Sequence, residues 1–141
     1  MGNSLVNSYV DTDVIIRLFT GDDEQKRKDA KALFEKVEKG TLEISVPDTV
    51  IADAVFVLSS PHLYGLPRNQ IRDLLAVLLR LSNFKVENKQ VVIKALDFYV
   101  DKNVDFGDAM LAVLTRASKN KLIYSYDHDF DKIEGIIRKE P

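Results

Sequence analysis

Apolar and polar residues follow two rhythms along this chain. Short alternating or apolar stretches predict strands at residues 6–10, 42–46, 83–87 and 121–125. Longer stretches with apolar residues three and four apart predict helices at 13–20, 22–40 and 49–60, and after Pro67, Asn88 and Asp105. Because strands alternate with helices, the pattern predicts an α/β fold with a mainly parallel central sheet. No linker interrupts it, so we expect a single domain over residues 1–141.

Residue types at the helix ends support these boundaries. The clearest amphipathic helix is expected to start at Asp22 or Asp23 and to stop at Gly40, and its charged face is most simply a solvated face. Asp48 and Asn88 are expected to cap the two helices that follow them.

Composition narrows the possible metal chemistry. The chain has no cysteine, which excludes disulfides and thiolate metal sites, and only two histidines, His62 and His128. Any bound metal would have to be held mainly by oxygen, which favours hard ions such as Mg²⁺ or Mn²⁺.

The apolar segments are too short for a membrane protein. None approaches the roughly 20 residues of a membrane span. The first ten residues lack the basic start and apolar stretch of a signal peptide, so we expect a cytoplasmic protein with no membrane association.

Several aspartates follow predicted strands or begin apolar helices. Asp11 follows the first strand, Asp127 follows the last one, and Asp105 and Asp108 stand at the start of a helix. Helix capping explains Asp11 and Asp105 equally well, and Thr12 could cap in place of Asp11. For Asp129 and Asp131, which alternate behind Asp127, a polar turn is the simpler interpretation, as is a surface position for His128.

Asp53 is harder to explain by capping. It lies inside the apolar stretch 50–58, five residues past Asp48, so it is expected to be buried. A buried carboxylate needs compensation, either from a basic partner, from a polar edge of the helix, or from a site.

Together these acids suggest a metal site. In a parallel α/β fold, the positions of Asp11, Asp53, Asp108 and Asp127 converge on the carboxyl edge of the sheet. Carboxylates gathered there repel one another unless a cation sits among them. Bound Mg²⁺ or Mn²⁺ would suit the hydrolysis of a phosphate ester.

The net charge does not oppose such a substrate. The formal value is −2, from 20 basic and 22 acidic residues. If five acids hold metal, 17 remain against 20 basic residues, a balance that suits a polyanion.

Four ordered stretches resemble the PIN domain, in particular the VapC-type ribonuclease toxins of toxin–antitoxin pairs. They are "YVDTDVIIRLF", "VPDTVIADAVFVL", "VDFGDAMLAVL" and "IYSYDHDFDKI", and the resemblance that they carry extends over nearly the whole chain. The resemblance implies a three-layer α/β/α sandwich and Mg²⁺- or Mn²⁺-dependent cleavage of RNA. It also implies a homodimer and a small antitoxin protein that inserts into the active-site groove.

The resemblance assigns roles residue by residue. The four acids of the family fall on Asp11, Asp53, Asp108 and Asp127, as metal ligands and catalytic residues. In the family, the acid at the position of Asp105 often contributes to the site beside the third acid.

Hydroxyl residues complete this assignment, and three positions depart from the usual pattern. Thr12 and Ser125 would position phosphate or water, although Ser125 stands where Thr is commoner. Asp53 replaces the usual Glu and is one methylene shorter, and Asp13 replaces the usual Asn and adds a negative charge. The last two changes leave the number and affinity of the metals open.

Three other functions fit parts of the sequence. A PIN-like domain with weakened catalysis could act by binding a partner, which Asp53 and Asp13 would explain. The "VDTDV" stretch also fits the start of haloacid-dehalogenase-type phosphatases, with Asp11 as nucleophile, but that family gives Asp53 no role. A phosphoacceptor receiver module is less compatible, because its acceptor should end a strand whereas Asp53 lies inside a predicted helix.

Overall fold

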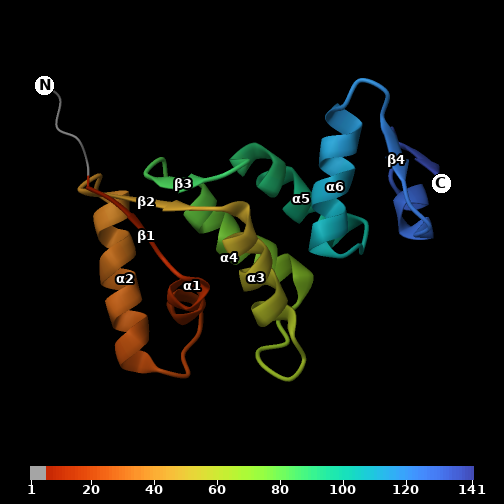
Figure 1. The fold of residues 1–141 in the computed structure, drawn as a ribbon. Helices are drawn as coiled ribbons and strands as arrows, with labels where there is room; N and C mark the ends of the chain where they lie inside the picture. Colours follow the sequence, from red (N-terminus) through yellow and green to blue (C-terminus); the bar gives the residue numbers. More distant parts are fainter. Residues whose placement is uncertain (1–5) are drawn as a thin grey trace, which may run out of the picture. The chain divides into compact units, whose positions relative to one another are not determined.

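A computed structural model describes residues 6–141 of the chain (Figure 1). The expectation drawn from the first ten residues rests partly on residues 1–5, which lie outside the described residues. The chain divides into two compact units, Met1–Lys89 and Gln90–Pro141.

The first unit is built on a three-stranded parallel sheet. Its strands are β1 (Val6–Tyr9), β2 (Leu42–Val46) and β3 (Phe84–Val86), in the order β1-β2-β3. Side chains alternate across the sheet, so Ile44 and Phe84 are buried on one face whereas Lys85 is exposed on the other. Since all three strands are parallel, their carboxyl ends lie at one edge.

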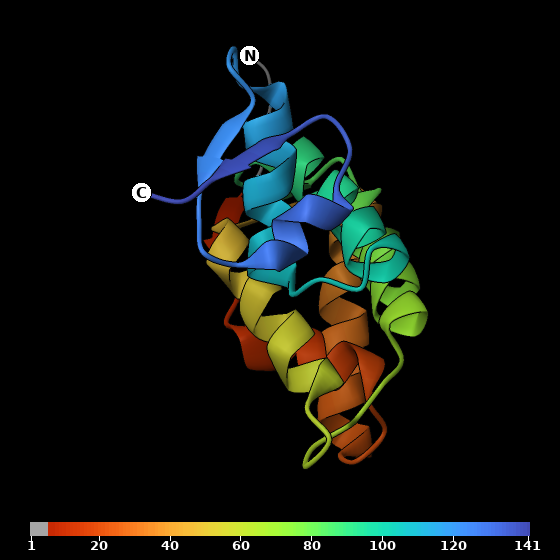
Figure 2. The same ribbon diagram turned by 90° about the vertical axis from the view of Figure 1, so that its right-hand side faces the viewer.

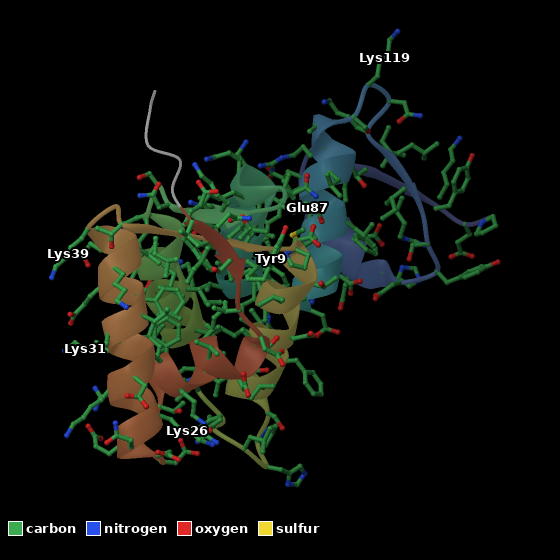
Figure 3. All side chains as sticks on the ribbon, turned by 60° about the vertical axis from the view of Figure 1, so that its left-hand side comes forward. Tyr9, Lys26, Lys31, Lys39, Glu87 and Lys119 are labelled. Atoms are coloured by element: carbon green, nitrogen blue, oxygen red, sulfur yellow. The ribbon has the colours of Figure 1, made fainter. Side chains whose placement is uncertain are left out.

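Four helices complete the first unit: α1 (Thr12–Phe19), α2 (Glu24–Glu38), α3 (Asp48–Ser59) and α4 (Arg68–Leu79). Helix α1 packs against α2 and α3, and the ring of Phe34 in α2 meets the ring of Phe84 in β3 edge-on at 5.8 Å. Lys31 on the outer side of α2 and Lys39, which follows its last residue, extend away from the unit (Figure 3), as expected for a solvated face.

The cap predicted for α2 agrees with the structure, and the cap predicted for α3 does not. Asp23 caps α2 by accepting a hydrogen bond from the Lys26 amide at 3.0 Å. The cap predicted at Asp48 is wrong, because Pro47 occupies that position and Asp48 is already helical. Asn88 has a left-handed backbone with φ 56°, and its side-chain amide donates to Asp48 Oδ2 at 3.1 Å. This contact joins the start of α3 to the turn after β3.

The second unit contains most of α5 (Lys89–Asp101), α6 (Phe106–Ala117), β4 (Leu122–Tyr124), the 3-10 helix η1 (His128–Lys132) and β5 (Ile137–Lys139). Figure 2 shows β4 and β5 side by side, and they pair in parallel. Residues of α6, η1 and the segment after it form a small core, made by Ala112, Phe130 and Ile133. The sequence pattern did not predict β5, which carries a single apolar residue.

The α/β class with parallel strands is confirmed. Both sheets are parallel, and helices separate the successive strands of the first sheet. Within residues 6–141, no helix combines the length and apolarity that crossing a bilayer requires.

Candidate active site

Asp11 stands between β1 and α1 at the carboxyl edge of the first sheet. Its backbone is extended (φ −80°, ψ 161°), and its Oδ1 accepts a hydrogen bond from the Thr12 amide at 2.7 Å. The carboxylate caps α1, as the simpler interpretation of the sequence proposed. A carboxylate has acceptor capacity on both oxygens, so capping through Oδ1 leaves Oδ2 able to bind a cation.

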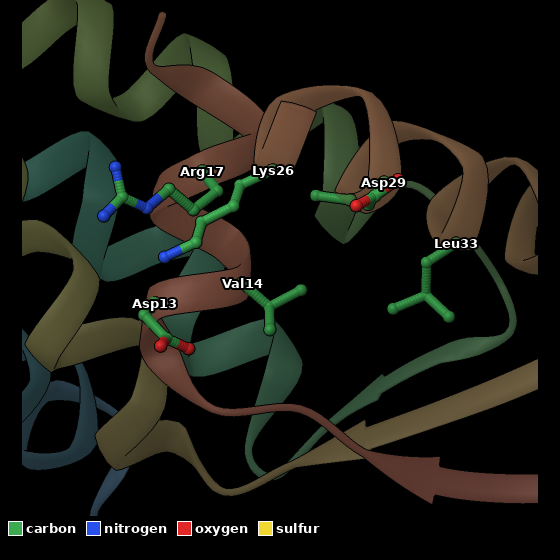
Figure 4. A pocket seen from close by; sticks show the side chains of 7 residues that line it. Asp13, Val14, Arg17, Lys26, Asp29 and Leu33 are labelled. Atoms are coloured by element: carbon green, nitrogen blue, oxygen red, sulfur yellow. The ribbon is translucent and has the colours of Figure 1, made fainter. Parts of the chain in front are cut away.

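Asp13 faces a different part of the first unit. It lines a hollow of about 350 Å³ between α1 and α2, together with Arg17, Lys26 and Asp29 (Figure 4). Arg17 is already paired with Asp22 at 3.1 Å. Asp13 therefore shares this hollow with both basic and acidic side chains of α1 and α2.

Asp53 is exposed, so the expectation that it is buried is wrong. Helix α3 buries Ile51, Val55 and Leu58 on one side, whereas Asp53 and Phe56 lie on the solvent side. The helix looked apolar all round because Phe56, although 73% exposed, is itself apolar. Asp53 consequently needs no buried partner, and its carboxylate is accessible to an ion.

A second hollow, of about 540 Å³, opens at the carboxyl edge of the first sheet. Tyr9, Ser45 and Lys85, which are paired across β1, β2 and β3, line it together with Glu87. Tyr9 is 72% exposed and lies two residues before Asp11. An exposed aromatic ring can stack on a base, and an ammonium group lining the same hollow can contact a phosphate.

The acids of the second unit gather around Asp108. Asp105 occupies the cap position of α6 without a capping hydrogen bond from its side chain, and Asp108 lies in the first turn. Burial raises the pKa of Asp108, and the negative charges of Asp127, Asp105 and Asp129 raise it further. Within this unit, the charges of Asp127, Asp105 and Asp129 therefore act on Asp108.

Ser125 and Asp127 form one hydrogen-bonded turn after β4. The Ser125 hydroxyl accepts a hydrogen bond from the Asp127 amide at 2.9 Å, and Asp127 Oδ1 accepts one from the Asp129 amide at 2.9 Å. Asp127 thus caps η1 through one oxygen. The contact made by Ser125 fixes the backbone that carries Asp127.

Sequence reasoning missed two residues of this region. Asp129 was assigned to an ordinary turn, but its charge acts on Asp108 and it pairs with Lys132 at 3.1 Å. Arg138 in β5 was not singled out, although it contacts the turn that carries Asp127. The regular spacing of acids in "DHDFD" was the only feature of the sequence that could have pointed to Asp129. No feature of the sequence pointed to Arg138.

The donor chemistry fits a hard divalent cation. Every candidate ligand offers carboxylate or hydroxyl oxygen, which Mg²⁺ and Mn²⁺ prefer. Burial and then three negative neighbours raise the pKa of Asp108, and a cation would offset the charge of those neighbours. As placed in residues 6–141, the side chains form no ready-made group of three acids or histidines around one ion.

Comparison with known proteins gives one family. The model described as "PIN domain" matches residues 8–136, so it spans both compact units. No curated protein matches the chain.

Proposed function

This chain belongs to the PIN domain family, and from this premise we propose that it is a metal-dependent endoribonuclease. PIN domains are typically nucleases, generally use divalent metal ions and act on nucleic acid. The mixed α/β structure with parallel strands is consistent with the α/β/α fold of the family. The observation that carries the proposal is the setting of Asp108, where burial and then the negative charges of Asp127, Asp105 and Asp129 raise the pKa of its carboxyl, charges that a bound cation would offset.

Each acid has a role in the proposal. Asp11, Asp53, Asp108 and Asp127 would be the ligands of Mg²⁺ or Mn²⁺ and the catalytic residues, and Asp105 would support Asp108 from the start of α6. When bound, the cation lowers the pKa of water and offsets negative charge on a phosphate.

The remaining site residues act by hydrogen bonding and charge. Ser125 holds the backbone of Asp127 through its hydroxyl, which supports its assignment to the site. Thr12 donates its amide to Asp11, and its hydroxyl would orient phosphate or water. Asp13 adds a negative charge two residues after Asp11.

The finer assignments follow from the four sequence stretches that resemble VapC toxins. We propose that residues 1–141 form a single PIN-like domain that acts in the cytoplasm as the toxin of a toxin–antitoxin pair. Its partners would be RNA, a small antitoxin protein and a second copy of the chain. A PIN-like domain that only binds a partner is the alternative, favoured by the departures at Asp53 and Asp13.

A metal-dependent cleavage assay tests the proposal. The wild-type protein should cleave RNA with Mn²⁺ and not with EDTA, and Asp11→Ala and Asp108→Ala should each abolish cleavage. Asp101→Ala, the same change at an exposed acid outside the cluster, should keep full activity. Full activity in the Asp108 variant would overturn the site, and an inactive wild type that still captures a small partner protein would favour the alternative.

A further inference from the structure

Arg138 lies in β5 with its side chain only 13% exposed, and its guanidinium group contacts four residues. Nε donates to Asp131 Oδ1 at 3.0 Å, and Nη1 donates to the backbone carbonyl of Ser125 at 3.0 Å and to Glu140 Oε2 at 3.2 Å. Nη2 lies 3.0 Å from His128 Nδ1. The N–H groups of Nε and Nη1 are thereby all donated to acceptors.

Three of these partners bracket Asp127 in the chain. They are the Ser125 carbonyl before it, and His128 and Asp131 after it. Two hydrogen bonds close the same turn. The Asp127 amide donates to the Ser125 hydroxyl, and the Asp129 amide donates to Asp127 Oδ1. Arg138 therefore ties both ends of the turn to β5.

We propose that Arg138 is the positioning residue for Asp127, fixing the turn 125–131 so that this carboxylate is held near the start of α6. The expected effect on RNA cleavage rests on the proposed nuclease function. The positioning of Asp127 by Arg138 does not depend on it. A planar guanidinium group suits the task, because its rigid fork can hold several acceptors at fixed angles, which an ammonium group cannot do.

The ion pair between Arg138 and Asp131 supports this geometry. Hydrogen bonds from Arg138 and then from His128 lower the pKa of Asp131, so its carboxylate stays charged opposite the guanidinium group. Direct binding of RNA phosphate by Arg138 is disfavoured, because the side chain is enclosed and its Nε and Nη1 groups already donate to Asp131, Ser125 and Glu140.

Amide hydrogen exchange measures the positioning directly. In Arg138→Ala, the Asp127 and Asp129 amides should exchange at least about tenfold faster than in the wild type, because the turn loses its anchor. Lys139→Ala is the matched control, since Lys139 is the exposed neighbour of Arg138 in β5, and it should leave both amides unchanged. Arg138→Lys keeps the charge and most of the stem, so it provides the test if the alanine variant does not fold, and it should also exchange faster.

RNA cleavage kinetics separate positioning from substrate binding. In Arg138→Ala and Arg138→Lys, kcat should fall and the Mn²⁺ concentration for half-maximal activity should rise, roughly 10- to 100-fold, as for other residues that orient metal ligands. KM for RNA should stay unchanged. Unchanged amide exchange would overturn the inference, as would a raised KM with normal kcat, which would make Arg138 an RNA contact. If the wild type does not cleave RNA, the proposed function fails, while the exchange experiment still decides the role of Arg138.

Discussion

Removing the charge of Asp108 should have opposite effects with and without metal. Asp108→Asn keeps the shape of the side chain but removes a negative charge that burial and the three carboxylates Asp127, Asp105 and Asp129 all disfavour. Repulsion between exposed carboxylates costs a few tenths to about 1 kcal/mol per neighbour. The positive end of α6 offsets about 0.3–1 kcal/mol of that cost. Because the pKa of Asp108 is raised, we conclude that repulsion and burial outweigh the helix dipole.

The expected result is a reversal of stability on adding Mn²⁺. Without metal, Asp108→Asn should stabilise the protein by about 0.5–1 kcal/mol, which raises Tm by roughly 2–4 °C in a chain of this size. At a Mn²⁺ concentration of about 100 times Kd, the wild type should gain about 2.7 kcal/mol. The variant lacks one proposed ligand and should gain less, so the wild type should become the more stable protein.

Thermal unfolding in EDTA and in MnCl₂ measures both effects. Asp101→Asn is the matched control, because it removes a charge at the end of α5, where the helix dipole disfavours it, and it should keep the full Mn²⁺ gain. The pH adds a check on the sign. The penalty at Asp108 is present above its raised folded-state pKa and disappears as the pH falls to the ordinary value, so the metal-free difference should close in acid. A variant that is less stable than the wild type in EDTA, or equal Mn²⁺ gains in both proteins, would refute this reasoning.

Two further predictions test the placement of helices in the first unit, both by urea unfolding. Asp23→Ala should cost about 1 kcal/mol, because the Lys26 amide loses its capping acceptor; Asp29→Ala on the same helix should cost less, and equal losses would argue against the cap. Ile51→Ala should cost about 2–5 kcal/mol, since Ile51 is fully buried. Phe56→Ala should change stability by no more than about 0.5 kcal/mol, and a large loss there would mean that the exposed side of α3 has been assigned wrongly.

The helices and all strands but one could be predicted from the sequence, because their causes are local. The alternation in β2 and the apolar stripe of α2 depend on neighbours within a few residues. Asp23 as a cap is of the same kind. The strand β5 was missed because its sequence, one apolar residue followed by two basic ones, becomes a strand only by pairing with β4.

The candidate site was partly predictable. The sequence places Asp11 after the first strand and Asp108 at the start of an apolar helix, and both positions are as expected. The sequence could not show that the side of α3 carrying Asp53 is exposed. A helix with apolar residues on every side does not indicate which side the rest of the fold covers.

The sequence by itself determined the α/β order of the elements, the family and the identity of the candidate acids, since these depend on residue type and on spacing along the chain. Only the tertiary structure decided what surrounds each acid. Asp48 pairs with Asn88 across 40 positions instead of capping α3, and Arg138 anchors the turn of Asp127 from 11 positions away. Hydrogen bonds and charge interactions act over a few ångströms in space whatever the separation in sequence, so such partners become visible only in the folded chain.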